Sequence, residues 1–325
     1  MRILCLASEV DPLAKTGGLA DVTGALSKSL GAMGHDVRIV LPLYRAVARD
    51  RCGLRPMSIQ LTVLEREVRV WEGALPPGHA RVYCIDQPAW FNRDGLYQAD
   101  GKDYPDNLER FSGLALAALA LLPQLDWRPD IIHCHDWQAA LACAHLAFGE
   151  AASQPFFAST AAVLTIHNLA YQGLFPPGQW ALTGLPASAF QIDGLEFYGK
   201  INCLKGGLRS AAMLTTVSPT YAEKLVRDVM VGKQAPQQIA VASAGQRIGD
   251  RRGAQLPHHA GDVDALAAGI PREGVRPVQA APHQAPQAHP FINGRIERYR
   301  CDHRVPVPGS PPEAECLAPE VSARS

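Results

Sequence analysis

A chain of 325 residues that is 47 % apolar has room for one large domain or two ordinary ones. Its formal net charge is zero and no basic block occurs, which argues against a nucleic-acid-binding surface. No apolar stretch is long enough for a signal peptide or a bilayer span, and the eight cysteines form no Cys-x-x-Cys pair, so we expect a cytoplasmic protein without a membrane partner, a metal site or disulfides.

In chain order, the first two-thirds of the sequence alternates between apolar runs typical of strands and patterns typical of helices. We predict strands at residues 2–8, 36–43, 81–85, 131–135, 162–167 and 214–218. We predict helices at residues 19–33, 107–122, 138–148 and 201–212, and from residue 219 onward. Nearly all-apolar strands suit a parallel sheet covered on both faces. The fold class is therefore α/β, with a Rossmann-like, doubly wound parallel sheet.

A glycine loop follows the first predicted strand, in the sequence AKTGGLADV. Gly17 and Gly18 allow close backbone approach, the helix from Leu19 offers unpaired N–H groups, and Lys15 adds a positive charge. The spacing matches neither Gly-x-x-x-x-Gly-Lys nor Gly-x-Gly-x-x-Gly. From spacing alone, a phosphate-binding loop and a flexible strand-to-helix turn remain equally open.

A second polar cluster is DIIHCHDWQ, at the end of a predicted strand. His133 and His135 are two residues apart and face the same side, and Asp136 follows them. These residue types can bind a metal ion. The alternative is a packed strand histidine followed by an aspartate that caps the next helix.

A third cluster, LTIHNLAYQG, places His167 and Asn168 at the end of another strand. The polar loop at residues 93–107 contains two tyrosines and could reach over the same edge or be only a solvated connection. Because ligands of doubly wound sheets bind beyond the carboxyl ends of the strands, three clusters at those ends favour a ligand site.

The composition changes near Val231. Twelve of the 26 prolines lie after that residue, among repeated Gln, Ala, His and Arg, and no apolar periodicity is found there. We expect residues 231–325 to be largely disordered. A frameshifted coding sequence and a genuine disordered tail would both give such a composition.

Six segments in order along residues 1–225 resemble the bacterial glycogen synthase and plant starch synthase family, glycosyltransferases of family 5 with the GT-B fold. They are SEVDPLAKTGGLADVTGALSKSL, VRIVLPLY, DIIHCHDWQAAL, TIHNLAYQGLFP, GLEFYGKINCLKGGL and TTVSPTYAEKL. The resemblance implies that residues 1–230 form the N-terminal domain of a GT-B enzyme. It also implies transfer of glucose from ADP-glucose to the non-reducing end of an α-1,4-glucan such as glycogen, with retention and with no cofactor besides the donor substrate.

The resemblance assigns His167 and Asp136 to catalysis, where they position and polarise the donor and neither acts as a nucleophile. It also implies a set of substrate-binding residues: Lys15, Thr16, Gly17, Gly18, Asp21, Tyr97 and Asn168.

The family's second domain is not found in the sequence after residue 225, so we expect this chain to have little or no glucosyltransferase activity. Two alternatives remain: a non-catalytic glucan-binding remnant, and a metal-dependent hydrolase that uses His133, His135 and Asp136. The choice between ADP-glucose and UDP-glucose is open, because the nucleotide contacts of the family come largely from the second domain.

Overall fold

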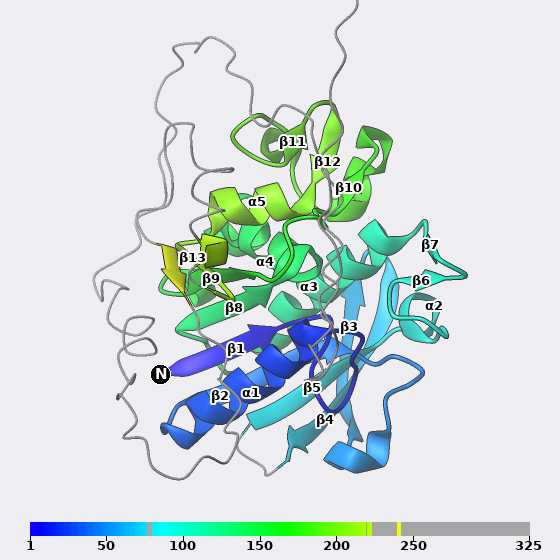
Figure 1. The fold of residues 1–325 in the computed structure, drawn as a ribbon, viewed down its shortest axis with the longest axis vertical. Helices are drawn as coiled ribbons and strands as arrows, with labels where there is room; N and C mark the ends of the chain where they lie inside the picture. The colour runs from blue at the N-terminus through cyan, green and yellow to red at the C-terminus, as the bar shows by residue number, and fades with distance from the viewer. Residues whose placement is uncertain (77–79, 219, 223–238, 242–325) are drawn as a thin grey trace, which may run out of the picture. The chain divides into compact units, whose positions relative to one another are not determined.

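Apolar runs that alternate with helical segments build one large sheet with helices on both faces (Figure 1). The computed structural model describes residues 1–76, 80–218, 220–222 and 239–241. Within these residues the sheet has nine strands, in the order β14-β13-β9-β8-β1-β2-β5-β4-β3. Their bounds are β1 Arg2–Leu6, β2 Asp36–Pro42, β3 Arg55–Val63, β4 Arg66–Leu75, β5 Ala80–Asp86, β8 Ile131–His135, β9 Ala161–Ile166, β13 Met213–Thr216 and β14 Ile239–Val241.

Helices and two small sheets complete the described part of the chain. The α-helices are α1 Gly18–Ala32, α2 Pro88–Phe91, α3 Asn107–Gln124, α4 Asp136–Phe148 and α5 Cys203–Ser210. Short 3-10 helices are η1 Arg49–Cys52, η2 Glu150–Ser153, η3 Pro155–Phe157, η4 Pro177–Thr183 and η5 Ala187–Ala189. One small sheet joins β10 Leu174–Phe175, β12 Lys200–Asn202 and β11 Glu196–Phe197, and the other pairs β6 Gln98–Ala99 with β7 Lys102–Asp103.

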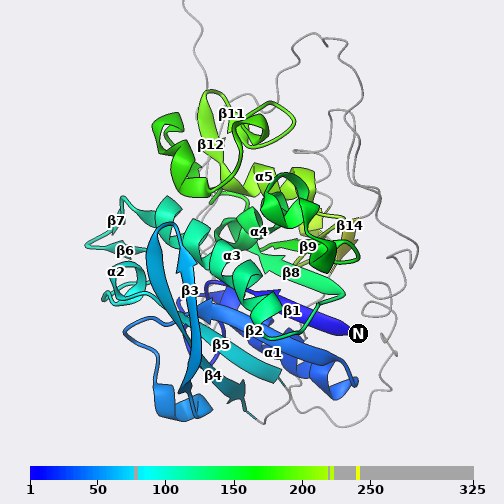
Figure 2. The same ribbon diagram turned by 180° about the vertical axis from the view of Figure 1, so that it is seen from behind.

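The centre of the sheet is parallel and buried on both faces. β8 and β9 are buried at every residue, and β1 at every residue except the first. α1 packs against β2 on one face, while α3 and α4 lie on the other, as the two opposite views show (Figures 1 and 2). Apolar strands covered on both sides are what a parallel sheet requires, so the predicted doubly wound class is confirmed.

The sequence analysis missed β3 and β4, which extend the sheet with antiparallel pairs at one end. Their pattern is an alternation rather than a continuous apolar run. Leu61, Val63, Val68 and Val70 are buried, and exposed or half-buried residues separate them. Period-2 alternation is the signal of a strand with one covered face, and here it would have found both strands.

The predicted helix at residues 201–212 begins later than expected. Lys200–Asn202 forms β12, and the Asn202 side chain accepts the Lys205 N–H at 2.9 Å. Asparagine at the N-cap satisfies one of the amides that the first turn leaves unpaired, so α5 starts at Cys203.

The path of the chain reverses direction across the sheet at β1. The chain moves from β1 to β2 and β5 on one side, then returns to β8 and β9 on the other side. In doubly wound sheets the ligand-binding crevice lies at the carboxyl ends of the two strands beside such a reversal, here β1 and β8. The glycine loop follows β1 and the His-His-Asp cluster follows β8, so both predicted sites border this crevice.

The expected tail at residues 231–325 lies outside the described residues except for Ile239–Val241, as does most of the helix expected from residue 219. All six cysteines in the described part of the chain are buried free thiols. No helix among the described residues is both long and apolar enough to cross a membrane.

Candidate active site

Polar groups from three adjacent parallel strands meet beside the crevice. β8 lies between β1 and β9. The Asp136 carboxylate, after β8, accepts the backbone N–H groups of His167 at 2.7 Å and Asn168 at 3.3 Å, after β9. Cys5 of β1 contacts His135 of β8 through Sγ and Nε2, 3.3 Å apart. The structure therefore brings the predicted His-Asp and His-Asn clusters into direct contact.

Gly17 and Gly18 border open space where α1 begins. A Cβ built on either residue would meet no atom within 4 Å, whereas a Cβ on Gly24 would lie 2.7 Å from the Asp11 carbonyl oxygen. Neither loop glycine has a positive φ, so neither backbone conformation nor internal packing requires glycine there. No side chain caps the first turn of α1. The loop thus leaves room for an external group next to a helix N-terminus.

Lys15 is exposed beside this space and is paired with acidic side chains. Its Nζ lies 2.5 Å from Asp21 Oδ1, in the first turn of α1, and 4.0 Å from Asp11 Oδ1. The hydrogen bond and charge of Asp21 raise the pKa of Lys15. The predicted residues Lys15 and Asp21 therefore neutralise one another here, and an anionic ligand would compete with Asp21 for the ammonium group.

Glu9 is a buried carboxylate that the sequence analysis missed, and it holds the glycine loop. One carboxylate oxygen accepts the Thr16 N–H at 2.5 Å and the Gly17 N–H at 3.2 Å. The other accepts the hydroxyls of Thr16 and Tyr97, each at 2.6 Å. Thr16, predicted to bind substrate, is therefore engaged with Glu9 through both its amide and its side chain. A charge three residues beyond a buried strand, in LASEV, is the signal that would have singled out Glu9.

Tyr97 reaches the glycine loop from the segment between α2 and α3. Its hydroxyl donates to Glu9 and lies 2.7 Å from Ser8 Oγ. Burial raises the pKa of Tyr97 well above its ordinary value, so the hydroxyl keeps its proton and donates to the carboxylate. Of the two alternatives for the loop at residues 93–107, the structure supports the one in which it reaches the sheet edge.

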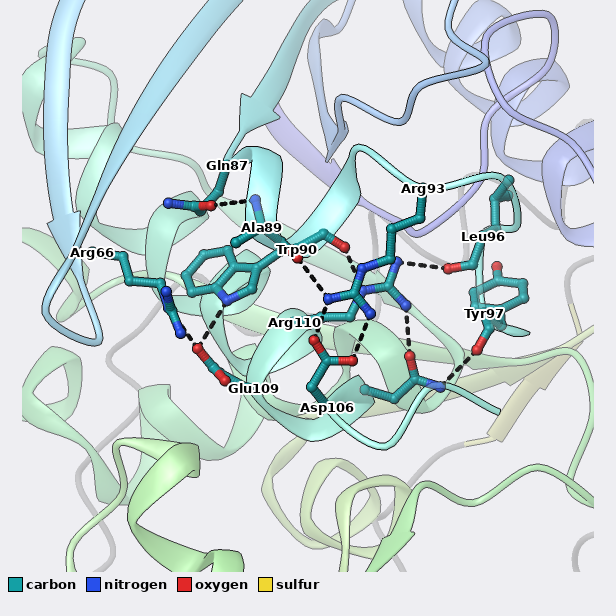
Figure 3. Close-up of polar contacts among 11 residues, drawn as sticks. Arg66, Gln87, Ala89, Trp90, Arg93, Leu96, Tyr97, Asp106, Glu109 and Arg110 are labelled. Carbon is teal, nitrogen blue, oxygen red and sulfur yellow. Dashed lines mark hydrogen bonds and ion pairs between the residues drawn. The ribbon is translucent and has the colours of Figure 1, made fainter. Parts of the chain in front are cut away.

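Arg110 fixes the backbone on which Tyr97 is mounted (Figure 3). It is fully buried, and its guanidinium donates to the carbonyls of Trp90 at 2.6 Å and Leu96 at 2.8 Å and to Asn107 Oδ1 at 2.6 Å. Asn107 in turn donates to the Tyr97 carbonyl at 2.9 Å. A planar guanidinium group, whose N–H donors point in fixed directions, can bind three separate acceptors at once.

We expect Arg110→Lys to lower the free energy of unfolding by about 2–3 kcal/mol, because a single ammonium group leaves buried acceptors unpaired. Denaturant titration measures the loss. Arg66→Lys is the matched control, since Arg66 is exposed and pairs with Glu109 by one contact of 2.6 Å; we expect a change within about 0.5 kcal/mol there. Equal effects of the two substitutions would contradict the assigned role of Arg110.

Three histidines lie side by side across β8 and the end of β9. The rings of His133 and His135 stack with centroids 4.4 Å apart, and His135 Nδ1 lies 3.0 Å from His167 Nε2. His133 Nε2 lies 2.6 Å from Thr165 Oγ1. Burial lowers the pKa of His133 to about 3 and of His167 to about 4, and that of His135 falls well below its ordinary value. All three rings are therefore neutral at pH 7.

Asp136 sits in a strained, buried position at the start of α4. Its φ is +56°, a left-handed conformation that aspartate tolerates better than most residues. Burial raises its pKa to about 7, even though the amides of His167 and Asn168 favour the charged form. Perturbed carboxyl groups beside a crevice are typical of functional sites.

The sequence that carries this geometry is similar to known proteins. The family described as starch synthase catalytic domain matches residues 2–235. The chain belongs to this family. Glycogen synthase 2 of Geobacter sulfurreducens is 46 % identical over 230 residues, which cover 70 % of this chain and 47 % of that protein. Glycogen synthase of Syntrophotalea carbinolica is 46 % identical over 229 residues, with 69 % and 47 % covered.

A solved structure of the family gives the same match. It is the catalytic domain of starch synthase IV from Arabidopsis thaliana, bound to ADP and acarbose. It is 32 % identical, with a TM-score of 0.62, and the match covers 69 % of this chain and 46 % of that one. The chain therefore spans about half the length of the curated relatives it matches. The predicted family is confirmed, and the match lies in residues 2–235 of this chain.

The geometry of this starch synthase domain does not support the metal-dependent hydrolase alternative. His135 directs one ring nitrogen at Cys5 and the other at His167, and His133 directs Nε2 at Thr165. Within the described ranges, no three side chains of His, Cys, Asp or Glu are placed to hold a metal ion. His133, His135 and Asp136 therefore do not converge on a common point.

Proposed function

We propose that this chain provides the N-terminal half of a glucosyltransferase site that takes glucose from ADP-glucose and passes it to an α-1,4-glucan. The observation that carries the proposal is the open space over Gly17 and Gly18, beside Lys15 and at the edge where Asp136 and His167 meet. The ADP and acarbose bound to the Arabidopsis relative, a nucleotide and a sugar-like molecule, support both substrate classes.

The chemistry of the site fits a nucleotide-sugar donor. When glucose leaves ADP, negative charge grows on the diphosphate, and a helix N-terminus with a nearby cation stabilises such charge. In this proposal the first turn of α1 faces the diphosphate, and Lys15 turns from Asp21 toward it. His167 and Asn168 contact the sugar, and Tyr97 lies against the donor. Asp136 orients the His167–Asn168 backbone through its two accepted hydrogen bonds.

We expect ADP-glucose to bind to the full chain, and Gly18→Val to weaken that binding at least about tenfold, or about 1.4 kcal/mol. The new side chain meets no protein atom at its Cβ, so the fold is kept while the ligand space is filled. Isothermal titration calorimetry measures both affinities. Gly178→Val is the matched control, because a Cβ on Gly178 of η4 also meets open space.

Unchanged affinity in Gly18→Val, or equal losses in both variants, would contradict the proposed donor site. A parallel titration with a linear maltooligosaccharide addresses the glucan-binding alternative. Binding of the oligosaccharide without binding of ADP-glucose would favour the non-catalytic remnant over the donor site.

A further inference from the structure

A continuous chain of hydrogen bonds runs from β1 through β8 to His167. Cys5 Sγ lies 3.3 Å from His135 Nε2, and His135 Nδ1 lies 3.0 Å from His167 Nε2. Cys5 is 3 % exposed and His135 is fully buried, whereas His167 is half-buried at the edge of the crevice. The three residues therefore connect the interior of the sheet to a proposed ligand-binding side chain.

Both ring nitrogens of His135 are engaged, so the proton positions along the chain are linked. A neutral imidazole carries one N–H donor and one acceptor nitrogen. If His135 receives a hydrogen bond at Nε2, it must donate from Nδ1 to His167 Nε2, and His167 then carries its proton on Nδ1. If His135 instead donates from Nε2 to Cys5, every direction reverses and His167 carries its proton on Nε2. Burial, which lowers the pKa of both histidines, keeps the rings neutral and excludes a state with a proton on each nitrogen.

Cys5 decides between the two directions. Burial raises the pKa of its thiol to about 12, although a hydrogen bond from the Ser27 side chain acts in the opposite direction, so the sulfur keeps its proton. Sulfur is a weak acceptor, whereas the free nitrogen of imidazole is a good one, so the pair is satisfied best when S–H donates to His135 Nε2. An unpaired nitrogen in this buried place would carry the full cost of desolvation.

We propose that Cys5 and His135 are positioning residues that fix His167 as the Nδ1–H tautomer. His167 then offers an N–H donor, not an acceptor, to an oxygen of the bound substrate, since no side chain of the described residues is hydrogen-bonded to Nδ1 and Nε2 is occupied by His135. His133 supports the arrangement by stacking on His135 at 4.4 Å. Only the identification of that oxygen with a donor sugar or phosphate rests on the proposed function.

The test is a long-range ¹H–¹⁵N correlation spectrum of the histidine rings in the full, ligand-free chain at pH 7. The His167 signals are assigned by their loss in His167→Gln. We expect a protonated-type Nδ1 and an unprotonated-type Nε2 for His167. A proton on Nε2 in the wild-type chain would overturn the proposal without any further variant.

Variants of Cys5 then separate a positioning role from simple packing. Cys5→Ser keeps a donor and should keep the single Nδ1–H tautomer. Cys5→Ala removes the donor, so His167 should exchange between tautomers and its two nitrogen shifts should move toward each other. Cys84→Ala is the matched control, a buried cysteine on β5, and should leave the His167 pattern unchanged.

An unchanged His167 pattern in folded Cys5→Ala would also overturn the proposal. Because these spectra contain no ligand, their outcome is independent of ADP-glucose binding. Failure of the calorimetric titration would remove the donor site, and failure of the tautomer pattern would remove only the role of Cys5 and His135.

Discussion

Replacing Glu9 with alanine should lower the free energy of unfolding by about 3–5 kcal/mol. Glu9 is 3 % exposed, and its carboxylate accepts four hydrogen bonds, from the Thr16 amide and hydroxyl, the Gly17 amide and the Tyr97 hydroxyl. Hydrogen bonds to a charged group are each worth about 1.5–3 kcal/mol, and water that enters the half-open loop offsets part of the loss. Denaturant titration gives the change, and hydrogen exchange of the Thr16 and Gly17 amides reports on the loop.

Glu9→Gln is the matched variant, and we expect it to cost about 1 kcal/mol or less. Its oxygen can accept the Thr16 and Gly17 amides. Its NH₂ group then faces two hydroxyls, of Thr16 and Tyr97, that can turn to accept, and Tyr97 can donate to Ser8 instead. The number of hydrogen bonds is preserved without the charge. Equal losses in Glu9→Ala and Glu9→Gln would show that the negative charge, rather than the set of acceptors, stabilises the loop.

Glu9 changes how the glycine loop is understood. The sequence predicts that the helix from Leu19 offers unpaired N–H groups to a phosphate, next to Gly17 and Gly18. In the structure, the Thr16 and Gly17 amides already bind a carboxylate of the chain itself. The space for a ligand therefore lies farther along, over the glycines and the first turn of α1, where a Cβ would meet nothing. Glu9 therefore holds the loop in place, and the amides that can bind a ligand are those of the first turn of α1.

The centre of the sheet could be predicted because its strands are short, continuous apolar runs. β1, β8 and β9 each lead into polar residues, a pattern typical of strands buried on both faces of a parallel sheet. Their shared edge follows from parallel pairing. β3 and β4 carry the weaker alternating pattern of strands with one covered face, so the strands at residues 55–75 are harder to predict.

The contacts within the site could not be predicted, because they depend on which strands are neighbours. The bond between His135 and His167 requires β8 to lie beside β9, and the contact of Cys5 with His135 requires β1 on the other side. The spacing of residues along the chain does not predict either of these strand pairings. The same holds for Tyr97, which reaches Glu9 only because the buried Arg110 orders the segment before α3.

Asp136 stands out because its burial works against folding. At neutral pH a buried carboxyl group without a cationic partner is either charged at a desolvation cost or protonated. An uncharged side chain at this buried position would avoid that cost and make the fold more stable. Asp136 lies beside the crevice and accepts hydrogen bonds from the His167 and Asn168 amides. A role in orienting this part of the proposed site explains why a buried carboxyl group is present there.

We therefore expect Asp136→Asn to stabilise the chain increasingly as the pH rises. The folded pKa of Asp136 is raised to about 7, against about 3.9 in the unfolded chain, so between these values the folded state binds more protons. The contribution of Asp136 to the free energy of unfolding of the wild type thus falls by up to about 1.4 kcal/mol per pH unit as the pH rises from about 4 to 7. Above pH 7 this contribution no longer changes. Asparagine does not titrate, so it adds no pH dependence to the free energy of unfolding. It also tolerates the left-handed conformation and can still accept hydrogen bonds from both amides.

The difference in unfolding free energy, Asp136→Asn minus wild type, should grow by about 2–4 kcal/mol between pH 4.5 and pH 8. The difference is the quantity to measure, by urea titration, because the buried histidines act in the opposite direction. Their lowered pKa values make both proteins less stable as the pH falls from about 6.5 toward 4, and this contribution cancels. Asp126→Asn is the matched control, an exposed aspartate with φ +47°, and its difference should stay within about 0.5 kcal/mol at every pH. A pH-independent difference for Asp136→Asn would mean that the carboxyl group titrates normally and is not held in a desolvated site.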